Sequence, residues 1–533
     1  MSRAQAKSSP THEHARRIAR AIAKGGPPPF SAELDLYCEA SPHEIFTSFA
    51  EAARHMPPAG SDESLAIAYM FLLQRLLEHL RYRTDRGYAD AAALIAEFQA
   101  DVVAQVEAER VDGRMLAFVA GALHQSKIPA APALAAAVSQ RASAEGRDTP
   151  LPIDVRAALS GMLESCGGDP FMLVDSLMEA AHAMPADVRS TLAAALALSG
   201  LAEARAAAVL LLLDREAGVR GTVAEALAQV AAALTAADLR RMIAMRNWRP
   251  ENERAAIDTI VRKARAAGID CAPWQAGGVE TIFASCIDGA AAQGFILMSA
   301  VGRKVRMSTI LTKDGLADAS TSEPQSLRTI ERDLKETGAP MLDVSRAFLD
   351  RMVAHHLALG LAKGEVPAPG LLQVAETIGG ADWQPARLSI DEAIAGLIAD
   401  TPKHLRKPAA VSATLRRSDE LYDLEVIAQS WFEDDPQIAQ AVERTDGRDR
   451  GKLAECLLHT FIAHRRERWI DIVGRTALWM RAASSPNQLC WPELAIVAKA
   501  LANGRDMADI GLMRDVALRT IGALGDAGRL RRA

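Results

Sequence analysis

One short phrase recurs at a nearly constant interval, and it constrains the fold of this chain more than any other feature. The phrase reads Asp154-Val155-Arg156, then Asp187-Val188-Arg189, then Gly218-Val219-Arg220. The arginines are 33 and 31 residues apart, and a degenerate copy at Arg254 follows 34 residues after Arg220. Repeats of roughly 20 to 50 residues are typical of stacked supersecondary units, so this stretch predicts an α-solenoid.

Each copy of the phrase continues in helical register. Apolar residues after the second and third arginines recur at i, i+3 and i+4, which places them on one helical face. They are Leu192, Ala195 and Leu196, and then Val223, Ala226 and Leu227. A further helix is expected before each of the later copies, over residues 171–184, 203–214 and 237–246.

The phrase resembles that of the HEAT-repeat family, whose units commonly place a polar turn residue before Val-Arg and then an Ala-rich second helix. The resemblance covers residues 132–269, about a quarter of the chain, and the third copy departs from it by having Gly218 at the Asp position. It implies that Arg156, Arg189 and Arg220 are structural residues that bond adjacent units. A basic ladder that binds phosphates is the less favoured alternative.

Composition fits a fold that is mostly α-helical. The chain has 533 residues, 49% hydrophobic but only 5% aromatic, and this length exceeds one ordinary core. The net charge of −6 gives no overall attraction to nucleic acid or to an anionic membrane. Six scattered cysteines without a Cys-x-x-Cys pair indicate thiols in a reducing compartment.

Location and membrane association follow from the apolar segments. The basic helix near residues 14–24 lacks the apolar core of a signal peptide, and no apolar run approaches the ~20 residues that span a bilayer. We therefore expect a cytoplasmic protein without membrane attachment.

Five regions are predicted along the chain. Strand-like runs near 279–287, 294–301 and 305–311 predict a three-stranded antiparallel sheet inserted between helical regions. A basic, Pro-bounded connector at 401–408 suggests the last boundary. The regions are a polar, basic N-terminal segment (1–30), an N-terminal helical region (31–131), the HEAT-like repeats (132–269), a small α+β element with the sheet (270–400) and a C-terminal helical region (401–533).

The residues proposed to bind a partner or ligand lie around the predicted strand turns. They are Asp288, Gly289, Arg303, Lys304 and His356. A carboxylate and an imidazole in one cleft could perform acid–base chemistry. However, Asp-Gly is an ordinary hairpin turn, and the adjacent His355 and His356 point about 100° apart on a helix. No catalytic residue is therefore assigned.

No metal ion or cofactor is expected. Cys456 and His459 share a helical face through their i, i+3 spacing, but two ligands do not make a metal site. Phosphate-binding, dinucleotide-binding, serine-hydrolase and zinc-protease motifs are absent from the sequence.

The leading hypothesis is a non-catalytic protein-interaction scaffold, in which a HEAT-like α-solenoid and a helical cap present the inserted sheet to a protein partner. One alternative is an enzyme or small-ligand binder with a site where the 279–311 sheet meets the 343–363 helix. A second alternative is nucleic-acid binding through a concave solenoid face. The sequence leaves the partner and the oligomeric state open.

Overall fold

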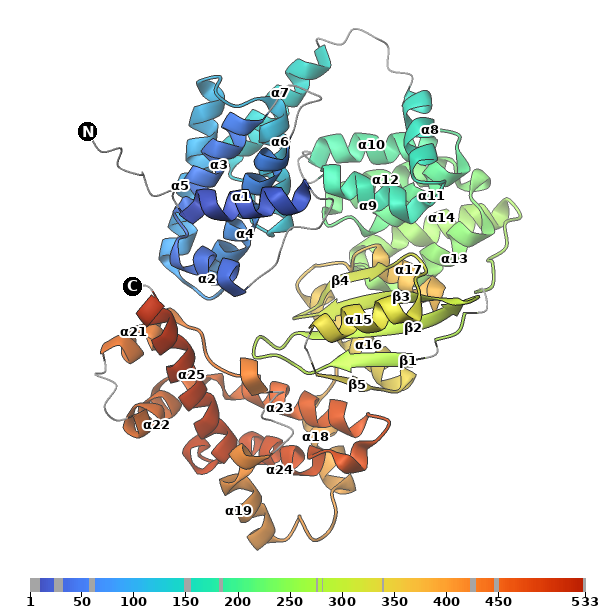
Figure 1. Cartoon of the computed structure of the whole chain (residues 1–533). Coiled ribbons are helices and arrows are strands. Elements are labelled where there is room, and N and C mark those ends of the chain that lie inside the picture. Colours follow the sequence, from blue (N-terminus) through green and yellow to red (C-terminus); the bar gives the residue numbers. More distant parts are fainter. Residues whose placement is uncertain are drawn as a thin grey trace, which may run out of the picture.

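The computed structural model shows a mostly helical chain with one small sheet between two helical regions (Figure 1). The structure describes residues 10–23, 32–56, 63–147, 155–181, 186–274, 277–279, 281–337, 340–421, 428–444 and 450–530. None of the described helices combines the length and apolar character that crossing a bilayer requires.

The N-terminal helices form a bundle with its own hydrophobic core. Helix α4 supplies the centre, because Leu72, Leu73, Leu76 and Leu77 recur at helical spacing and are fully buried. The bundle extends beyond the predicted bounds of 31–131 at both ends. Helix α1 packs on α4, with Ile18 buried, and α7 packs on α5 and α6. The helices are α1 (Pro10–Ile22), α2 (Ala32–Ala40), α3 (Glu44–His55), α4 (Ser64–Asp85), α5 (Ala89–Glu107), α6 (Gly113–Gln125) and α7 (Pro132–Arg147).

The repeated phrase lies in α8, α10 and α12, within a group of helices that pack on one another. Helix α12 packs on both α10 and α14, and α11 packs on both α9 and α13. Small side chains permit this close approach, and Ala204, Ala207 and Ala208 of α11 are fully buried. The helices are α8 (Val155–Ser165), α9 (Pro170–Ala181), α10 (Ala186–Leu198), α11 (Ala202–Leu210), α12 (Ala217–Gln229), α13 (Ala236–Met245) and α14 (Arg254–Ala266), with short 3-10 turns η1 (Leu211–Leu213), η2 (Ala231–Ala233), η3 (Arg246–Trp248) and η4 (Glu251–Glu253).

The inserted sheet is antiparallel, as expected, but the predicted number of three strands is wrong. It has five strands in the order β4-β3-β2-β1-β5. The missed strands are a short run of small residues and a three-residue strand that forms only by pairing with distant β1. The strands are β1 (Thr281–Ser285), β2 (Gln293–Val301), β3 (Lys304–Thr312), β4 (Leu316–Thr321) and β5 (Met341–Asp343).

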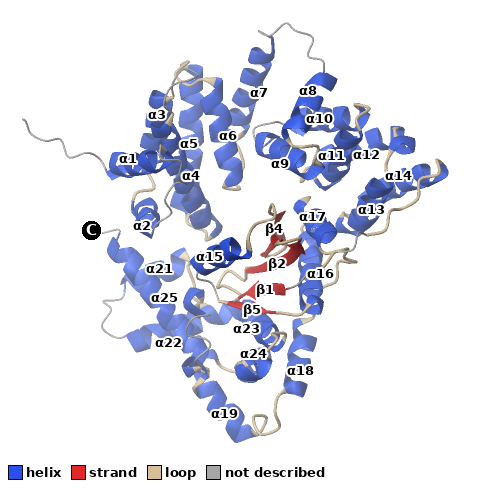
Figure 2. Cartoon of the chain, turned by 45° about the vertical axis from the view of Figure 1, so that its right-hand side comes forward, coloured by secondary structure: helices blue, strands red, loops and turns tan. Residues whose placement is uncertain are grey.

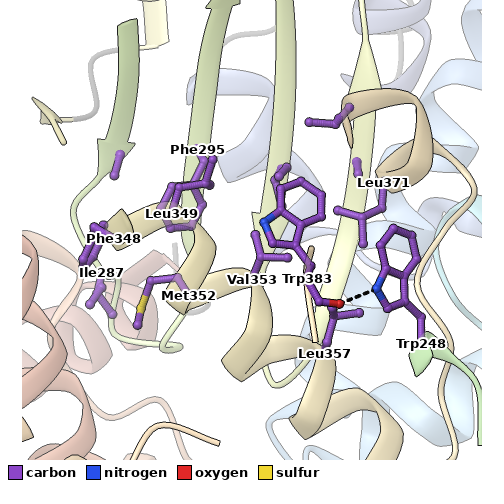
Figure 3. Packing of buried hydrophobic residues seen from close by; sticks show 14 of the residues in the cluster. Trp248, Ile287, Phe295, Phe348, Leu349, Met352, Val353, Leu357, Leu371 and Trp383 are labelled. Atoms are coloured by element: carbon purple, nitrogen blue, oxygen red, sulfur yellow. Dashed lines mark hydrogen bonds between the residues drawn. The ribbon is translucent and has the colours of Figure 1, made fainter. Parts of the chain in front are cut away.

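One face of the sheet packs on α16 and α17, and α15 lies on the other face. On the packed face, Phe295 of β2 meets Phe348 of α16 with ring centroids 6.2 Å apart. Trp248 donates its indole N–H to the carbonyl of Trp383 at 2.7 Å, which ties the repeat region to the same core (Figure 3). Figure 2 shows α15 on the opposite side of the sheet from α16 and α17. These helices are α15 (Leu327–Thr337), α16 (Arg346–Ala362) and α17 (Gly370–Thr377).

The C-terminal helices share one continuous hydrophobic core with the sheet and the repeats. Helix α18 packs on α23 and α24, although the prediction placed its residues in the preceding region. The elements are α18 (Ile390–Asp400), α19 (Pro408–Arg416), α21 (Pro436–Arg444), α22 (Arg450–Thr460), α23 (Arg466–Arg481), α24 (Trp491–Ala502) and α25 (Gly511–Leu530), with turns η5 (Ser418–Glu420), η6 (Ala428–Ser430), η7 (Ile462–Arg465), η8 (Pro486–Gln488) and η9 (Met507–Asp509).

Candidate functional site

Asp288 organises the turn between β1 and β2 by local hydrogen bonds. Its Oδ1 accepts from the backbone N–H groups of Ala290 and Ala292, both at 2.8 Å. These bonds are those of an Asx turn, in which the carboxylate replaces a backbone acceptor. The carboxylate that we predicted as a ligand-binding group therefore holds the loop shape.

Gly289 docks this turn on the C-terminal region. A Cβ at this position would lie 2.0 Å from the carbonyl oxygen of Ser430, so only glycine fits. The Gly289 N–H donates to Ser430 Oγ at 3.2 Å, and the Gly289 carbonyl accepts from Arg468. The predicted site residue is thus a contact between the sheet and the C-terminal helices.

Arg303 and Lys304 lie at the tip of the β2–β3 hairpin and are exposed. The nine residues of β2 separate this tip from the Asp288 turn. At about 3.3 Å per residue, the two ends are roughly 30 Å apart. The structure therefore does not bring Asp288 and Gly289 together with Arg303 and Lys304.

His355 and His356 lie in α16 and are almost fully buried. His355 Nδ1 accepts from the Leu388 N–H at 3.0 Å, whereas neither ring nitrogen of His356 has a hydrogen-bond partner among the residues that the structure describes. Burial, reinforced by the positive charge of Arg475, lowers the pKa of His355 to about 4 and that of His356 to about 2. Both rings are therefore neutral at pH 7.

Two of the repeat arginines form buried ion pairs with carboxylates that lie outside their own helices. Arg189 is buried and pairs with Asp214 at the end of η1. Arg220 donates to the carbonyl of Asp214 at 2.7 Å and binds the carboxylate of Glu253 before α14. Arg156 lies in α8, and its predicted side-chain role falls outside the described residues.

The second face of the sheet carries apolar side chains that are not in the main core. Phe283 pairs with Ile296, and Met298 pairs with Met307, directly across neighbouring strands. These four side chains are partly buried, and Leu311 beside them is 45% exposed. We call these five residues the open face. Helix α15 covers it in part.

An acidic triplet that the sequence analysis did not identify joins several regions. Glu433 is fully buried, and its carboxylate accepts from Trp469 Nε1 at 2.9 Å and from Arg468 Nη1 at 2.6 Å. Arg465 completes the ion-pair network. Asp434 accepts from the Tyr88 hydroxyl of the N-terminal bundle at 2.8 Å. In the sequence, the only signal for this contact is the run of three acidic residues close to Trp431.

Among the described residues, no three His, Cys, Asp or Glu side chains lie close enough together to bind a metal ion. Cys456 is exposed and lies 3.8 Å from the hydroxyl of Thr460. His464 contacts the carbonyl of Thr460 at 2.9 Å.

Two domain models named after Y4lR match parts of the chain. The Y4lR second domain matches residues 185–268, which hold α10 to α14, and the Y4lR C-terminal helical domain matches residues 391–525, which hold α18 to most of α25. The uncharacterized protein y4lR of Sinorhizobium fredii is 26% identical over 293 residues, 53% of this chain and 54% of that protein. The chain thus spans about half the length of this curated relative. No solved structure matches the chain.

Proposed function

We propose that this protein is a non-catalytic scaffold that binds a protein partner through the open face of its sheet. In this proposal, α9 to α14 form a short HEAT-like α-solenoid, in which α10, α12 and α14 make one row and α9, α11 and α13 the other. The solenoid and the C-terminal helices hold the sheet rigidly from one side, so the other side is available to a partner.

The observation that carries the proposal is the apolar character of the open face. Aromatic residues and methionine are enriched in protein interfaces, and the open face carries Phe283 opposite Ile296 and Met298 opposite Met307. Of the five residues of the open face, Leu311 is 45% exposed, and apolar surface left in contact with water can mark an interaction site. Methionine side chains also adapt to partners of different shape.

The two alternatives receive less support from the geometry. An enzyme site between the sheet and α16 would need a cleft, but that interface is filled by packed side chains such as Phe295, Phe348 and Leu349 (Figure 3). Nucleic-acid binding through the repeats would need free cations. Arg189, Arg220 and Arg249 instead pair with Asp214 or Glu253.

The test replaces one exposed leucine of the open face by a charge. The full chain and its Leu311→Glu variant are used to capture proteins from an extract of the producing cells, and retained proteins are quantified by mass spectrometry. The matched control is Leu518→Glu on α25, because Leu518 is 44% exposed and Leu311 is 45% exposed. We expect a specific partner to be lost from Leu311→Glu alone. Equal retention by all three proteins would refute the proposal.

A further inference from the structure

A cavity of about 420 Å³ opens among the C-terminal helices. Its walls come from four elements: α18, the connector between α18 and α19, α19 itself, and the C-terminal half of α24. Small-molecule sites commonly have volumes of roughly 300 to 1,000 Å³. The cavity therefore has the size of a ligand pocket, and it is separate from the open face of the sheet.

The floor of the cavity is apolar. Leu415 and Ile496 are buried, and Ile398 and Val411 are partly buried. Ala500 adds a small side chain between them. This floor would bind an alkyl or aromatic group by removing its apolar surface from water.

The rim of the cavity is cationic. Arg406, Lys499 and Arg505 line it, and no carboxylate does. Arg505 also pairs with Asp509 at 2.7 Å. Arg406 and Lys499 make no ion pair and no side-chain hydrogen bond with any residue that the structure describes. Two cations at the edge of an apolar pocket are thus available to a ligand.

The cations at the end of α24 are not needed to cap this helix. The carbonyl of Leu501 accepts from the Gly504 N–H at 3.1 Å, and that of Ala500 accepts from the Arg505 N–H at 3.0 Å. Gly504 adopts a positive φ of 78°, as this type of helix end requires. The last carbonyls of α24 are therefore satisfied by backbone donors, which leaves the Lys499 ammonium free.

Arg406 lies in the connector between α18 and α19, on a different element from Lys499 of α24. Thr401 is buried, with its hydroxyl donating to the carbonyl of Leu397 at 2.9 Å, and the Leu405 N–H donates to the carbonyl of Pro402 at 3.0 Å. Pro408 then begins α19. Arg406 therefore lies two residues before α19, whereas Lys499 lies on α24.

We propose that this cavity binds a small anionic amphiphile, in the chemical class of the medium-chain carboxylates. The apolar chain lies on the floor of Ile398, Leu415 and Ile496, and the carboxylate accepts hydrogen bonds from Arg406 and Lys499. Hydrogen bonds between ionised partners are the strongest kind that such a rim can supply. A cationic amphiphile would meet like charges, and a neutral one would leave the rim unused.

The test is isothermal titration calorimetry of the full chain with sodium decanoate at an ionic strength of about 0.15 M, where charges beyond roughly 8 Å are screened. We expect 1:1 binding, at least about tenfold weaker binding of decanol, and no binding of decyltrimethylammonium. A tenfold loss corresponds to about 1.4 kcal/mol. Equal affinity for decanoate and decanol would overturn the assignment of the rim.

Variants locate the site. Arg406→Glu and Lys499→Glu should each weaken decanoate binding at least about tenfold, and Ala500→Phe should abolish it by filling the floor. Lys403→Glu is the matched control, because Lys403 is exposed on the same connector but does not line the cavity. Circular dichroism melting curves verify that each variant is folded. Decanoate binding that survives both Arg406→Glu and Lys499→Glu, or that falls equally in Lys403→Glu, would refute the proposal.

Discussion

Arg220 binds the carboxylate of Glu253 with two hydrogen bonds, from Nε to Oε2 at 2.8 Å and from Nη2 to Oε1 at 2.6 Å. Arg249 donates to the same carboxylate at 2.6 Å, and both guanidinium groups are almost fully buried. Burial alone would raise the pKa of Glu253, but the hydrogen bonds from the two arginines outweigh it and lower the pKa. One carboxylate is thus the shared counter-charge of two buried guanidinium groups between α12 and α14.

Glu253→Gln should therefore destabilise the repeat region strongly. The variant leaves two buried guanidinium groups without a counter-charge, which costs about 3–5 kcal/mol of unfolding free energy. Asp258→Asn is the control, because Asp258 also accepts two hydrogen bonds from one arginine, Arg246, but this pair is largely exposed. The control should cost at most about 1 kcal/mol. Urea unfolding followed by circular dichroism measures both, and equal losses would contradict the prediction.

Glu376 makes the contact between the repeats and the sheet region dependent on pH. It accepts from Arg240 at 2.9 Å and from Arg241 at 2.8 Å, both on α13. Burial would raise the pKa of Glu376, but the bonds from Arg241 and Arg240 lower it overall. A carboxyl group with a lowered folded pKa adds stability above its unfolded pKa of about 4.3 and loses that stability as the pH falls.

Glu376→Gln should accordingly cost about 2 kcal/mol at pH 7, where the charged hydrogen bonds are complete. The difference between wild type and variant should persist down to about pH 5 and shrink at lower pH. Thermal or urea unfolding across pH 3 to 7 measures this difference. A difference that stays constant down to pH 3 would show that the charge of Glu376 does not contribute.

His356 should make the protein less stable as the pH falls, but its replacement should not reduce stability at pH 7. Its pKa is lowered to about 2 by burial and by Arg475, so the unfolded chain binds a proton near pH 6.5 that the folded chain does not. Stability from this group is therefore complete above about pH 6.5 and falls as the pH decreases. His356→Leu should be as stable as wild type or more stable at pH 7, and should lose less stability on acidification.

His355→Leu is the matched comparison on the same helix turn. It removes the acceptor of the Leu388 N–H and leaves a buried donor unsatisfied, which costs about 1–3 kcal/mol. Melting temperatures between pH 5 and 8 separate the two variants. A stability loss at pH 7 from His356→Leu as large as that from His355→Leu would contradict the view that His356 has no polar partner.

The sequence predicts local structure in this protein better than it predicts contacts between distant residues. The 31- to 34-residue spacing located α10, α12 and α14 because their apolar faces repeat within each helix. Strand β5 was missed because its three residues form a strand only through pairing with β1, far away in the sequence. Composition alone gives no signal for such a strand.

The candidate site residues show the same limit. Gly289 and His356 were selected by residue type, but their roles depend on neighbours such as Ser430 and Arg475 that lie far away in the sequence. The basic connector at 401–408 was recognised only as a boundary. Its Arg406 acquires its proposed binding role because α24, about 90 residues later in the sequence, lines the same cavity.

The N-terminal bundle should fold by itself. Its core is separate from that of the rest of the chain, and Phe49, Leu76 and Phe98 are fully buried within the bundle. Its contacts with the C-terminal region include polar ones, Tyr88 to Asp434 at 2.8 Å and Arg86 to Asp434 at 3.8 Å. One hydrogen bond and one ion pair add little free energy compared with a buried apolar core.

A fragment of residues 1–147 should therefore unfold cooperatively, with far-ultraviolet circular dichroism typical of a helical bundle. The control fragment 1–107 lacks α6 and α7, which pack on α4 and α5, so it should expose core residues and aggregate or melt without a sharp transition. If the longer fragment also lacked a cooperative transition, the joint at Asp434 would have to supply a substantial part of the stability. The Asp434→Asn variant of the full chain measures that part directly, and we expect its cost to stay near 1 kcal/mol.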